Sequence, residues 1–278
     1  MILHTGQIFH TPPADEWAPT WVLEEELRRQ LEDLGPPEKI RKFKQLVASS
    51  LISAGVESPG AILDDRYGEE ALFALTGTGM WLARPVEVPG SRPLAFEAGS
   101  GLAARLRSWP AEHVVKCLSL DGRGDLPRLL ELQDACIATG HELLVELVEP
   151  DPPLAELYAA GLRPDWWKLA PPGSEAAWAE ISAVTQEKDP HCRGVLLLGM
   201  EASVEALEQA FALAAAQPVC KGFAVGRSIF MDAARRWLAG RATDDEVVAE
   251  VRDRYLNLIS LWNDARRACK ESVSSASA

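Results

Sequence analysis

The sequence predicts a single α/β domain with the architecture of a TIM (β/α)8 barrel. Short apolar runs alternate with helical stretches, and the later runs recur roughly every 24–28 residues, close to one strand–helix unit. Seven such runs and a candidate first strand near the N-terminus make eight units, which suit a barrel. The main alternative is an open doubly wound sheet. No Gly-x-Gly-x-x-Gly motif follows an early strand, which disfavours a dinucleotide-binding version of that alternative.

The N-terminal segment is the least regular part of the chain. Ile2–Phe9 is the candidate first strand, and three prolines then interrupt regular structure. Glu, Leu and Arg residues predict a helix over Val22–Leu34, and a second helix follows over Glu38–Ala54. We therefore expect one barrel domain over residues 1–270, with an irregular segment at about residues 10–37.

The remaining strand candidates are apolar runs that end in polar residues or glycine. Helices over Leu126–Thr139 and Val204–Ala216 separate some of these runs. Thr243 opens the last helix, and Glu246 completes a capping box with it. The small polar residues 271–278 predict a disordered tail. The seven runs are Ala61–Asp65, Met80–Arg84, His113–Leu120, Glu142–Val148, Asp165–Leu169, Gly194–Leu198 and Gly222–Arg227.

Composition narrows the classes of partner. The 28 Lys and Arg residues against 41 Asp and Glu residues give a net charge of -13, which argues against nucleic acid and anionic membranes. No apolar run is long enough for a transmembrane helix. The 5 cysteines lie far apart and indicate reduced thiols, so we expect a cytoplasmic protein. The carboxylate pair at Asp64 and Asp65 has no His partner, and we expect neither a metal nor a cofactor.

Three neighbouring units place a charged residue where a barrel interior is expected. Alternate residues of a barrel strand point inward. Within Glu142–Val148 the odd-numbered residues are all apolar and should meet the helices, so Glu146 should point inward. The same alternation turns Lys116 and Lys168 inward, towards the carboxyl ends of the strands, where barrel enzymes bind substrates.

These three residue types suit amine catalysis. Loss of hydration and a neighbouring cation both favour the neutral amine of an interior lysine, and a neutral amine is a nucleophile. A carboxyl group beside it can move protons. The alternative is a structural network of buried ion pairs, and the sequence leaves both open.

The last predicted unit carries features of an anion site. Gly226 and Arg227 lie where the strand ends and a helix begins, so helix N–H groups and a guanidinium are available to an oxyanion. The preceding strand also ends in glycine, at Gly199, and barrel enzymes often bind phosphate after strands seven and eight. The alternative is an ordinary glycine turn with a surface arginine.

Seven motifs follow one another in a fixed order along the chain. They begin at Asp65 (DRYG), Ala83 (ARPVE, with PGSRP), His113 (HVVKCL), Gly140 (GHELLVE), Pro164 (PDWWKL), Cys192 (CRGVLLLG) and Lys221 (KGFAVGRSIF). Together they resemble the aldolase-like domain fused behind the sugar kinase 5-dehydro-2-deoxygluconokinase in bacterial myo-inositol breakdown, a domain similar to class I tagatose-bisphosphate aldolases. The resemblance covers roughly residues 40–265 and lacks the kinase half.

The resemblance implies a TIM barrel and a role for several residues. Lys168 matches the Schiff-base lysine, Lys116 the second active-site lysine and Glu146 the acid/base carboxylate. Family members open with a strand that ends in an aspartate motif, which Met1–Gln7 lacks. The further matches are Asp65, Arg66 and Arg84 for substrate binding and Gly199, Gly226 and Arg227 for phosphate binding.

The resemblance also implies an activity. The expected function is a class I aldolase acting on a phosphorylated keto sugar acid, such as 5-dehydro-2-deoxygluconate 6-phosphate, or on a related ketose phosphate. The alternative is a non-catalytic sugar-phosphate binding protein, or a partner of a separate kinase, that retains the barrel. The expected partner is a small sugar phosphate, with a homo-oligomer as a further expectation.

Overall fold

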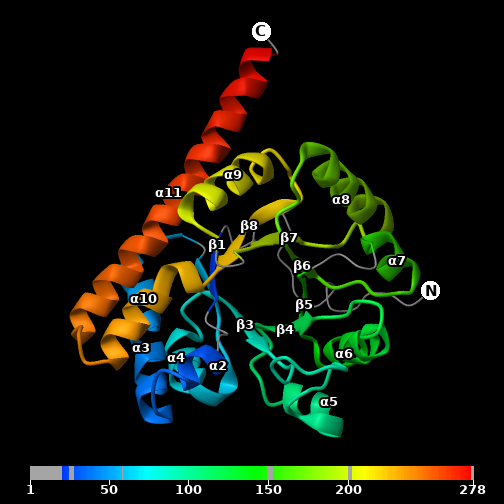
Figure 1. Ribbon diagram of the computed structural model, residues 1–278. Coiled ribbons are helices and arrows are strands. Elements are labelled where there is room, and N and C mark those ends of the chain that lie inside the picture. The colour runs from blue at the N-terminus through cyan, green and yellow to red at the C-terminus, as the bar shows by residue number, and fades with distance from the viewer. Residues whose placement is uncertain (1–20, 25–27, 58, 149–152, 200–201, 277–278) are drawn as a thin grey trace.

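Eight parallel strands close into a barrel, and helices surround it (Figure 1). The computed structural model describes residues 21–24, 28–57, 59–148, 153–199 and 202–276. The strands follow one another around the barrel in chain order, and β1 pairs with both β2 and β8. The predicted TIM barrel is therefore confirmed. The strands are β1 (Trp21–Glu24), β2 (Pro59–Ile62), β3 (Trp81–Pro85), β4 (His113–Ser119), β5 (Leu143–Leu147), β6 (Trp166–Leu169), β7 (Gly194–Leu198) and β8 (Cys220–Val225).

Helices follow most strands and form the outer layer (Figure 1). Their buried faces and the outward faces of the strands make one large apolar core. The helices are α2 (Arg28–Glu32), α3 (Pro37–Ala54), α4 (Asp65–Leu75), a 3-10 turn (Gly99–Gly101), α5 (Leu102–Leu106), α6 (Leu126–Thr139), α7 (Leu154–Ala159), α8 (Glu175–Lys188), α9 (Val204–Ala214), α10 (Arg227–Leu238) and α11 (Asp244–Ala276).

The first strand is not where the sequence predicts it. β1 lies at Trp21–Glu24, inside the segment expected to be irregular and at the start of the helix expected over Val22–Leu34. Trp, Val and Leu suit a strand, and pairing with both β2 and β8 overrides the helical preference of the Glu and Leu residues. Only α2 remains of that predicted helix. The candidate strand Ile2–Phe9 lies outside the described residues.

The tail prediction also differs from the structure. α11 continues to Ala276, through most of the segment for which the sequence predicts disorder. Extending a formed helix by one residue costs far less than nucleating one, so the packed body of α11 supports these extra turns. Val251, Tyr255 and Trp262 are buried and anchor that body against the barrel.

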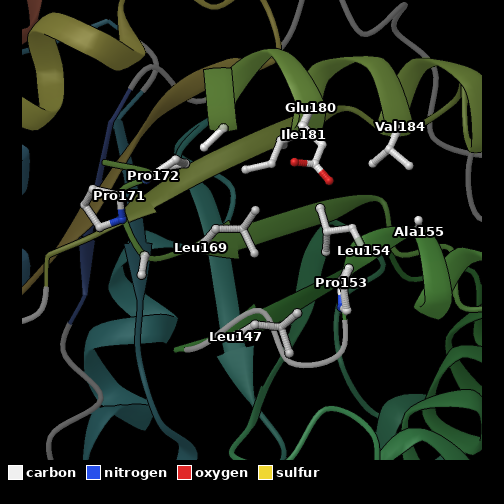
Figure 2. Close-up of a pocket in the computed structure, with 12 residues that line it drawn as sticks. Leu147, Pro153, Leu154, Ala155, Leu169, Pro171, Pro172, Glu180, Ile181 and Val184 are labelled. Carbon is white, nitrogen blue, oxygen red and sulfur yellow. The ribbon is translucent and has the colours of Figure 1, made fainter. Parts of the chain in front are cut away.

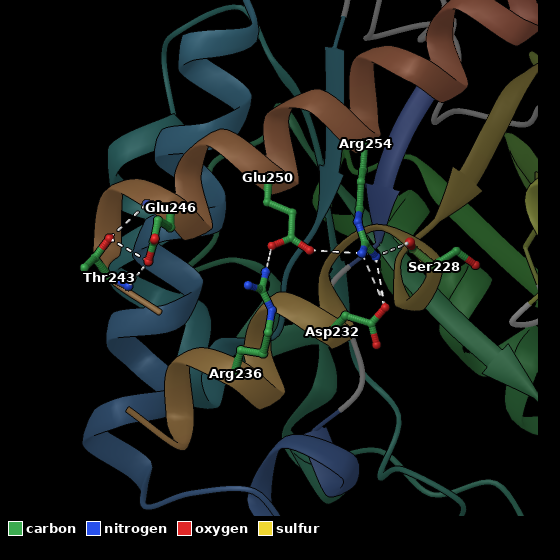
Figure 3. A network of polar contacts seen from close by, with 7 residues as sticks. All are labelled: Ser228, Asp232, Arg236, Thr243, Glu246, Glu250 and Arg254. Atoms are coloured by element: carbon green, nitrogen blue, oxygen red, sulfur yellow. Dashed lines mark hydrogen bonds and ion pairs between the residues drawn. The ribbon is translucent and has the colours of Figure 1, made fainter. Parts of the chain in front are cut away.

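The start of α11 is fixed by polar contacts (Figure 3). The predicted capping box is present, because the Thr243 backbone N–H donates to Glu246 Oε2 at 2.7 Å and the Glu246 N–H donates to Thr243 Oγ1 at 3.3 Å. Arg254 bridges from α11 to Asp232 on α10 and donates to the Ser228 carbonyl oxygen at 3.3 Å. These contacts hold the first turn of α10 in place.

Apolar side chains fill the interior of the barrel. They form a buried cluster separate from the core under the helices. The Trp81 and Trp166 rings meet edge to face at 5.8 Å within it. Strands β2 to β8 thus each have an apolar inner face below the carboxyl end. The cluster comprises Ile62, Trp81, Ala83, Val114, Leu144, Trp166, Leu196 and Ala224.

A buried polar cluster lies just before strands β5, β6 and β7. Arg193 Nη2 lies 2.8 Å from Glu142 Oε1, and Trp166 Nε1 donates to Glu142 Oε2 at 2.8 Å. Asp165 Oδ2 accepts a hydrogen bond from the Leu143 N–H at 2.8 Å. Burial, followed by the charge of Glu142, raises the pKa of Asp165 to about 8. Asp165 is therefore protonated in the folded protein at neutral pH.

This raised pKa makes stability depend on pH. An unfolded aspartate loses its proton near pH 4, so between about pH 4 and pH 8 unfolding releases a proton and the folded state loses stability as the pH rises. Asp165→Asn keeps the acceptor for Leu143 and stays neutral. We expect it to raise the unfolding free energy at pH 8 by on the order of 1–2 kcal/mol relative to wild type, with little change at pH 4. Urea unfolding at both pH values measures this. If the unfolding free energies of variant and wild type changed equally with pH, the prediction would be contradicted. Asp232→Asn, at an exposed carboxylate, is the control.

Candidate functional site

Four charged side chains form a chain of ion pairs at the carboxyl end of the barrel. Lys116 Nζ lies 2.7 Å from Glu87 Oε1 and 2.9 Å from Glu146 Oε2. Lys168 Nζ lies 3.1 Å from Glu146 Oε1. The four residues are buried, with exposed fractions of 0 % for Lys168, 1 % for Lys116, 3 % for Glu87 and 4 % for Glu146. Acidic and basic residues therefore alternate along this chain of ion pairs, and they come from four consecutive strand–helix units of the barrel.

The strands explain why these charges meet. Lys116, Glu146 and Lys168 each follow by two residues a member of the interior apolar cluster. Successive residues alternate between the two faces of a strand, so all three side chains lie on the inner face. Glu146 and Lys168 are partners in the register of β5 and β6. The structure thus brings together the three residues predicted to be catalytic.

The electrostatics of Glu146 follow from these neighbours. Burial acts to raise its pKa, but the charges of Lys116 and Lys168 and their hydrogen bonds outweigh burial and lower the pKa to about 2. Glu146 is therefore an ionised carboxylate at neutral pH. A carboxylate between two lysine amines can accept a proton from one of them and return it.

The residues predicted to bind phosphate lie at the ends of β7 and β8. Gly226 is the N-cap of α10, and Arg227 is the first residue of that helix. A Cβ atom on Gly199 would lie 2.9 Å from Val225 Cγ2, so close packing of the two strand ends requires glycine there. Ser228 Oγ donates to the Ala202 carbonyl oxygen at 3.0 Å and links the two loops. The structure thus brings Gly199, Gly226 and Arg227 to neighbouring strand ends, beside the N–H groups of a helix N-terminus.

The residues predicted to bind substrate lie elsewhere. Arg84 follows the interior residue Ala83, so it lies on the outer face of β3, where its Nη2 is 2.6 Å from Asp65 Oδ1. Its guanidinium stacks on Trp109 at 3.9 Å. The Arg66 side chain is 60 % exposed and pairs with Glu32. Strand alternation thus places Arg84 on the helix side of β3, and Asp65 and Arg66 form the first turn of α4. The two lysines, in contrast, lie on the inner face of the barrel.

Two acidic residues of this end of the barrel escaped the sequence prediction. Glu87 lies two residues beyond the end of β3. Ala83, Pro85 and Glu87 are successive alternate residues, so extending the strand pattern past Pro85 would have placed Glu87 on the inner face. Glu24 ends β1, opposite Ile62 in the register. The first strand of the barrel is therefore β1 at Trp21–Glu24 and not the candidate Ile2–Phe9, and it ends in a glutamate where the resembled family has an aspartate.

An apolar pocket of about 370 Å³ lies beside the site, between α7, α8 and the ends of β5 and β6 (Figure 2). Leu147 and Leu169, which directly follow Glu146 and Lys168, line it. Both leucines belong to the core between barrel and helices. The pocket therefore lies on the outer side of these strands, and the ion-paired lysines are not among its lining residues.

The described residues contain no group of three or more His, Cys, Asp and Glu side chains arranged to hold a metal ion. No helix among them is both long enough and apolar enough to cross a membrane.

Comparison with known proteins places the chain in a family. Residues 7–266 match the family described as "uncharacterized protein conserved in bacteria (DUF2090)". The chain belongs to this family. A search of curated protein sequences finds no match for the DUF2090 chain.

Solved structures show the same fold. The DUF2090 chain is similar to fructose-bisphosphate aldolase from Plasmodium falciparum, with a TM-score of 0.64 and 12% identity over 96% of each chain. It is also similar to Cgl0159 from Corynebacterium glutamicum, with a TM-score of 0.52 and 15% identity over 90% of this chain and 92% of that chain. At these identities the likeness shows the fold alone, a TIM barrel.

Proposed function

We propose that this DUF2090 protein is a class I aldolase that cleaves a phosphorylated keto sugar acid or a related ketose phosphate. One observation carries the proposal: the buried amine of Lys168 lies 3.1 Å from the carboxylate of Glu146, which also contacts Lys116 at 2.9 Å. Such an amine and carboxylate form the minimum apparatus for a Schiff base. The aldolase-like fold is consistent with it.

The first step joins Lys168 to the substrate. Glu146 accepts a proton from the Lys168 ammonium, and the free amine attacks the ketone carbon. Glu146 then returns the proton to the carbinol oxygen, which leaves as water. Ammonium and ketone thus become iminium and water with no net change in protons. The ionised state of Glu146 in the resting site suits this first transfer.

The second step breaks a carbon–carbon bond. A base removes the proton of the hydroxyl group β to the iminium carbon, an aldehyde leaves, and the bonding electrons enter the iminium to give an enamine. Protonation of the enamine carbon and addition of water then release the second product and regenerate the lysine. With 5-dehydro-2-deoxygluconate 6-phosphate as substrate, the products are malonate semialdehyde and dihydroxyacetone phosphate.

Trapping of the iminium tests the proposal. Borohydride reduces an iminium to a stable secondary amine, so incubation with dihydroxyacetone phosphate and borohydride should add one mass adduct, located on Lys168 by peptide mapping. Ketose phosphates that bind but leave no adduct on either lysine would instead support a sugar-phosphate binding protein.

The phosphate of the substrate should bind at the ends of β7 and β8. We expect Arg227→Ala to weaken binding of dihydroxyacetone phosphate by about 1.5–3 kcal/mol, the scale of a hydrogen bond to a charged group. Calorimetric titration measures the change. Arg235→Ala, at an exposed position of the same helix, is the control and should leave affinity unchanged. Equal affinity of Arg227→Ala and wild type would remove this phosphate site from the proposal.

A further inference from the structure

Cleavage of the carbon–carbon bond needs a base for the hydroxyl group β to the iminium carbon. We propose that Glu87 is this base, and therefore a second catalytic carboxylate beside Glu146. This inference rests on the proposed function, in which Lys168 forms the iminium. Glu87 is buried at the carboxyl end of the barrel, with an exposed fraction of 3 %.

The two carboxylate oxygens of Glu87 have different surroundings. Glu87 Oε1 accepts a hydrogen bond from Lys116 Nζ at 2.7 Å. Glu87 Oε2 is also buried, but among the described residues it has no hydrogen-bond partner. Nearly all buried polar atoms in native proteins have a partner, and a catalytic role is one recognised reason for an exception. Lys116 thus anchors one oxygen, and the other is available to a substrate hydroxyl.

A hairpin after β3 holds Glu87 in place. Glu87 forms an antiparallel bridge with Phe96. The Val86 carbonyl oxygen accepts a hydrogen bond from the Glu97 N–H at 2.9 Å, and the Val86 N–H donates to the Lys116 carbonyl oxygen at 3.0 Å. The backbone on both sides of the carboxylate is therefore tied to the barrel, and such fixed placement is what a catalytic base requires.

Glu87 and Lys168 approach the mouth of the barrel from nearly opposite sides. β3 and β6 are separated by two strands along one half of the closed barrel and by four along the other (Figure 1). The interior of an eight-stranded barrel is just wide enough for side chains to fill, so groups on both sides can contact one small substrate. The printed distances connect them: 2.7 Å from Glu87 to Lys116, 2.9 Å from Lys116 to Glu146 and 3.1 Å from Glu146 to Lys168.

The path expected for the substrate leads towards Glu87. In the proposed function the phosphate binds at the ends of β7 and β8, on one side of Lys168. The part that leaves as the aldehyde then extends to the other side, over the ends of β5, β4 and β3. Of the two carboxylates in the chain of ion pairs, Glu146 contacts both lysines and serves the proton transfers at nitrogen. Glu87 keeps Oε2 for the hydroxyl.

The step balances in protons and charge. Glu87 takes the hydroxyl proton, and the O–H electrons form the carbonyl bond of the aldehyde. The electrons of the breaking carbon–carbon bond form the double bond of the enamine, and the π electrons of the iminium move onto Lys168 Nζ. A carboxylate and an iminium thus become a neutral acid and a neutral enamine. After the aldehyde has left, return of the proton to the enamine carbon restores both charges.

Quenching with borohydride tests this role, with 5-dehydro-2-deoxygluconate 6-phosphate as the probe. Glu87→Gln keeps a hydrogen-bond acceptor for Lys116 but cannot take up a proton. It should form the iminium and then stop, so its adduct should have the mass of the whole substrate. The wild-type adduct should have the mass of the dihydroxyacetone phosphate fragment. Release of dihydroxyacetone phosphate should slow by about a hundredfold to ten-thousandfold in the variant.

Dihydroxyacetone phosphate alone gives two further measurements. Its trapping by borohydride requires no cleavage, so Glu87→Gln should be labelled at the wild-type level. Its uptake of deuterium from D2O at the enamine carbon uses the proton that Glu87 exchanges, so this uptake should slow as cleavage does. A purely structural role of Glu87 would instead change labelling and deuterium uptake together.

Matched variants make the outcome decisive. Glu87→Asp retains a carboxylate and should restore part of the cleavage rate. Glu142→Gln removes another buried glutamate, which pairs with Arg193, and should cleave at the wild-type rate. The inference is overturned if Glu87→Gln cleaves and exchanges at the wild-type rate, or if it is no longer labelled, because Glu87 would then act before cleavage. Loss of cleavage in Glu24→Gln, with normal cleavage in Glu87→Gln, would assign the base to the end of β1. Failure of the proposed function looks different: wild type forms no adduct with dihydroxyacetone phosphate.

Discussion

Lys168→Arg should form no adduct with dihydroxyacetone phosphate and borohydride and should show no turnover, while the barrel remains folded. A guanidinium stays protonated in proteins, so it cannot form an imine. It keeps a cation beside Glu146, and the buried carboxylate therefore retains its counter-ions. The loss is expected to be complete, because the covalent step has no substitute. Mass spectrometry after reduction and circular dichroism measure the two parts of this result.

Two further variants sharpen the result. Lys168→Ala should also abolish labelling. Its fold should survive, because the substitution removes a buried charge and no part of the apolar core. Lys116→Arg is the matched control, since it keeps a cation on the other side of Glu146 and leaves the Lys168 amine intact, so labelling should persist. An adduct on Lys116 in the wild-type protein would show that the two lysines have exchanged roles.

The position of the lysine pair could be predicted from the sequence for a local reason. In β5 Leu143, Val145 and Leu147 form an apolar face that should pack against the helices, so Glu146 must lie on the opposite face of the strand. In a closed barrel that other face is the interior. The same argument applies to β4 and β6, and periodicity alone therefore brings Lys116 and Lys168 to the site.

Other features depend on contacts between distant segments. β1 is a strand because it closes the gap between β2 and β8, and nothing within its Glu-rich surroundings shows this. Glu87 reaches Lys116 through a hairpin whose pairing with Phe96 the sequence does not reveal. Arg84 adjoins the interior residue Ala83 but lies on the opposite face, beside Asp65, and the motif that contains it does not reveal this.

Glu146→Gln should slow adduct formation by about a hundredfold to ten-thousandfold, the range usual for lost acid–base catalysis. Glutamine still accepts a hydrogen bond from Lys168, so the amine stays in place, but an amide cannot take up a proton and return it to the carbinol oxygen. Rapid quenching with borohydride at successive times gives the rate. Glu142 is a buried glutamate that pairs with Arg193 and lies outside the ion pairs of Lys116 and Lys168, so Glu142→Gln should react at the wild-type rate.

The pH dependence separates proton transfer by Glu146 from its charge. The carboxylate stabilises the ammonium forms of Lys116 and Lys168, so its removal favours the neutral amine that attacks the ketone. If charge were the whole effect, Glu146→Gln would react faster than wild type at low pH and equally fast at high pH, where the amine is neutral in both. Proton transfer predicts the opposite: a variant slower than wild type across the range, with the deficit persisting at the alkaline end. Equal alkaline rates would show that Glu146 acts by its charge alone.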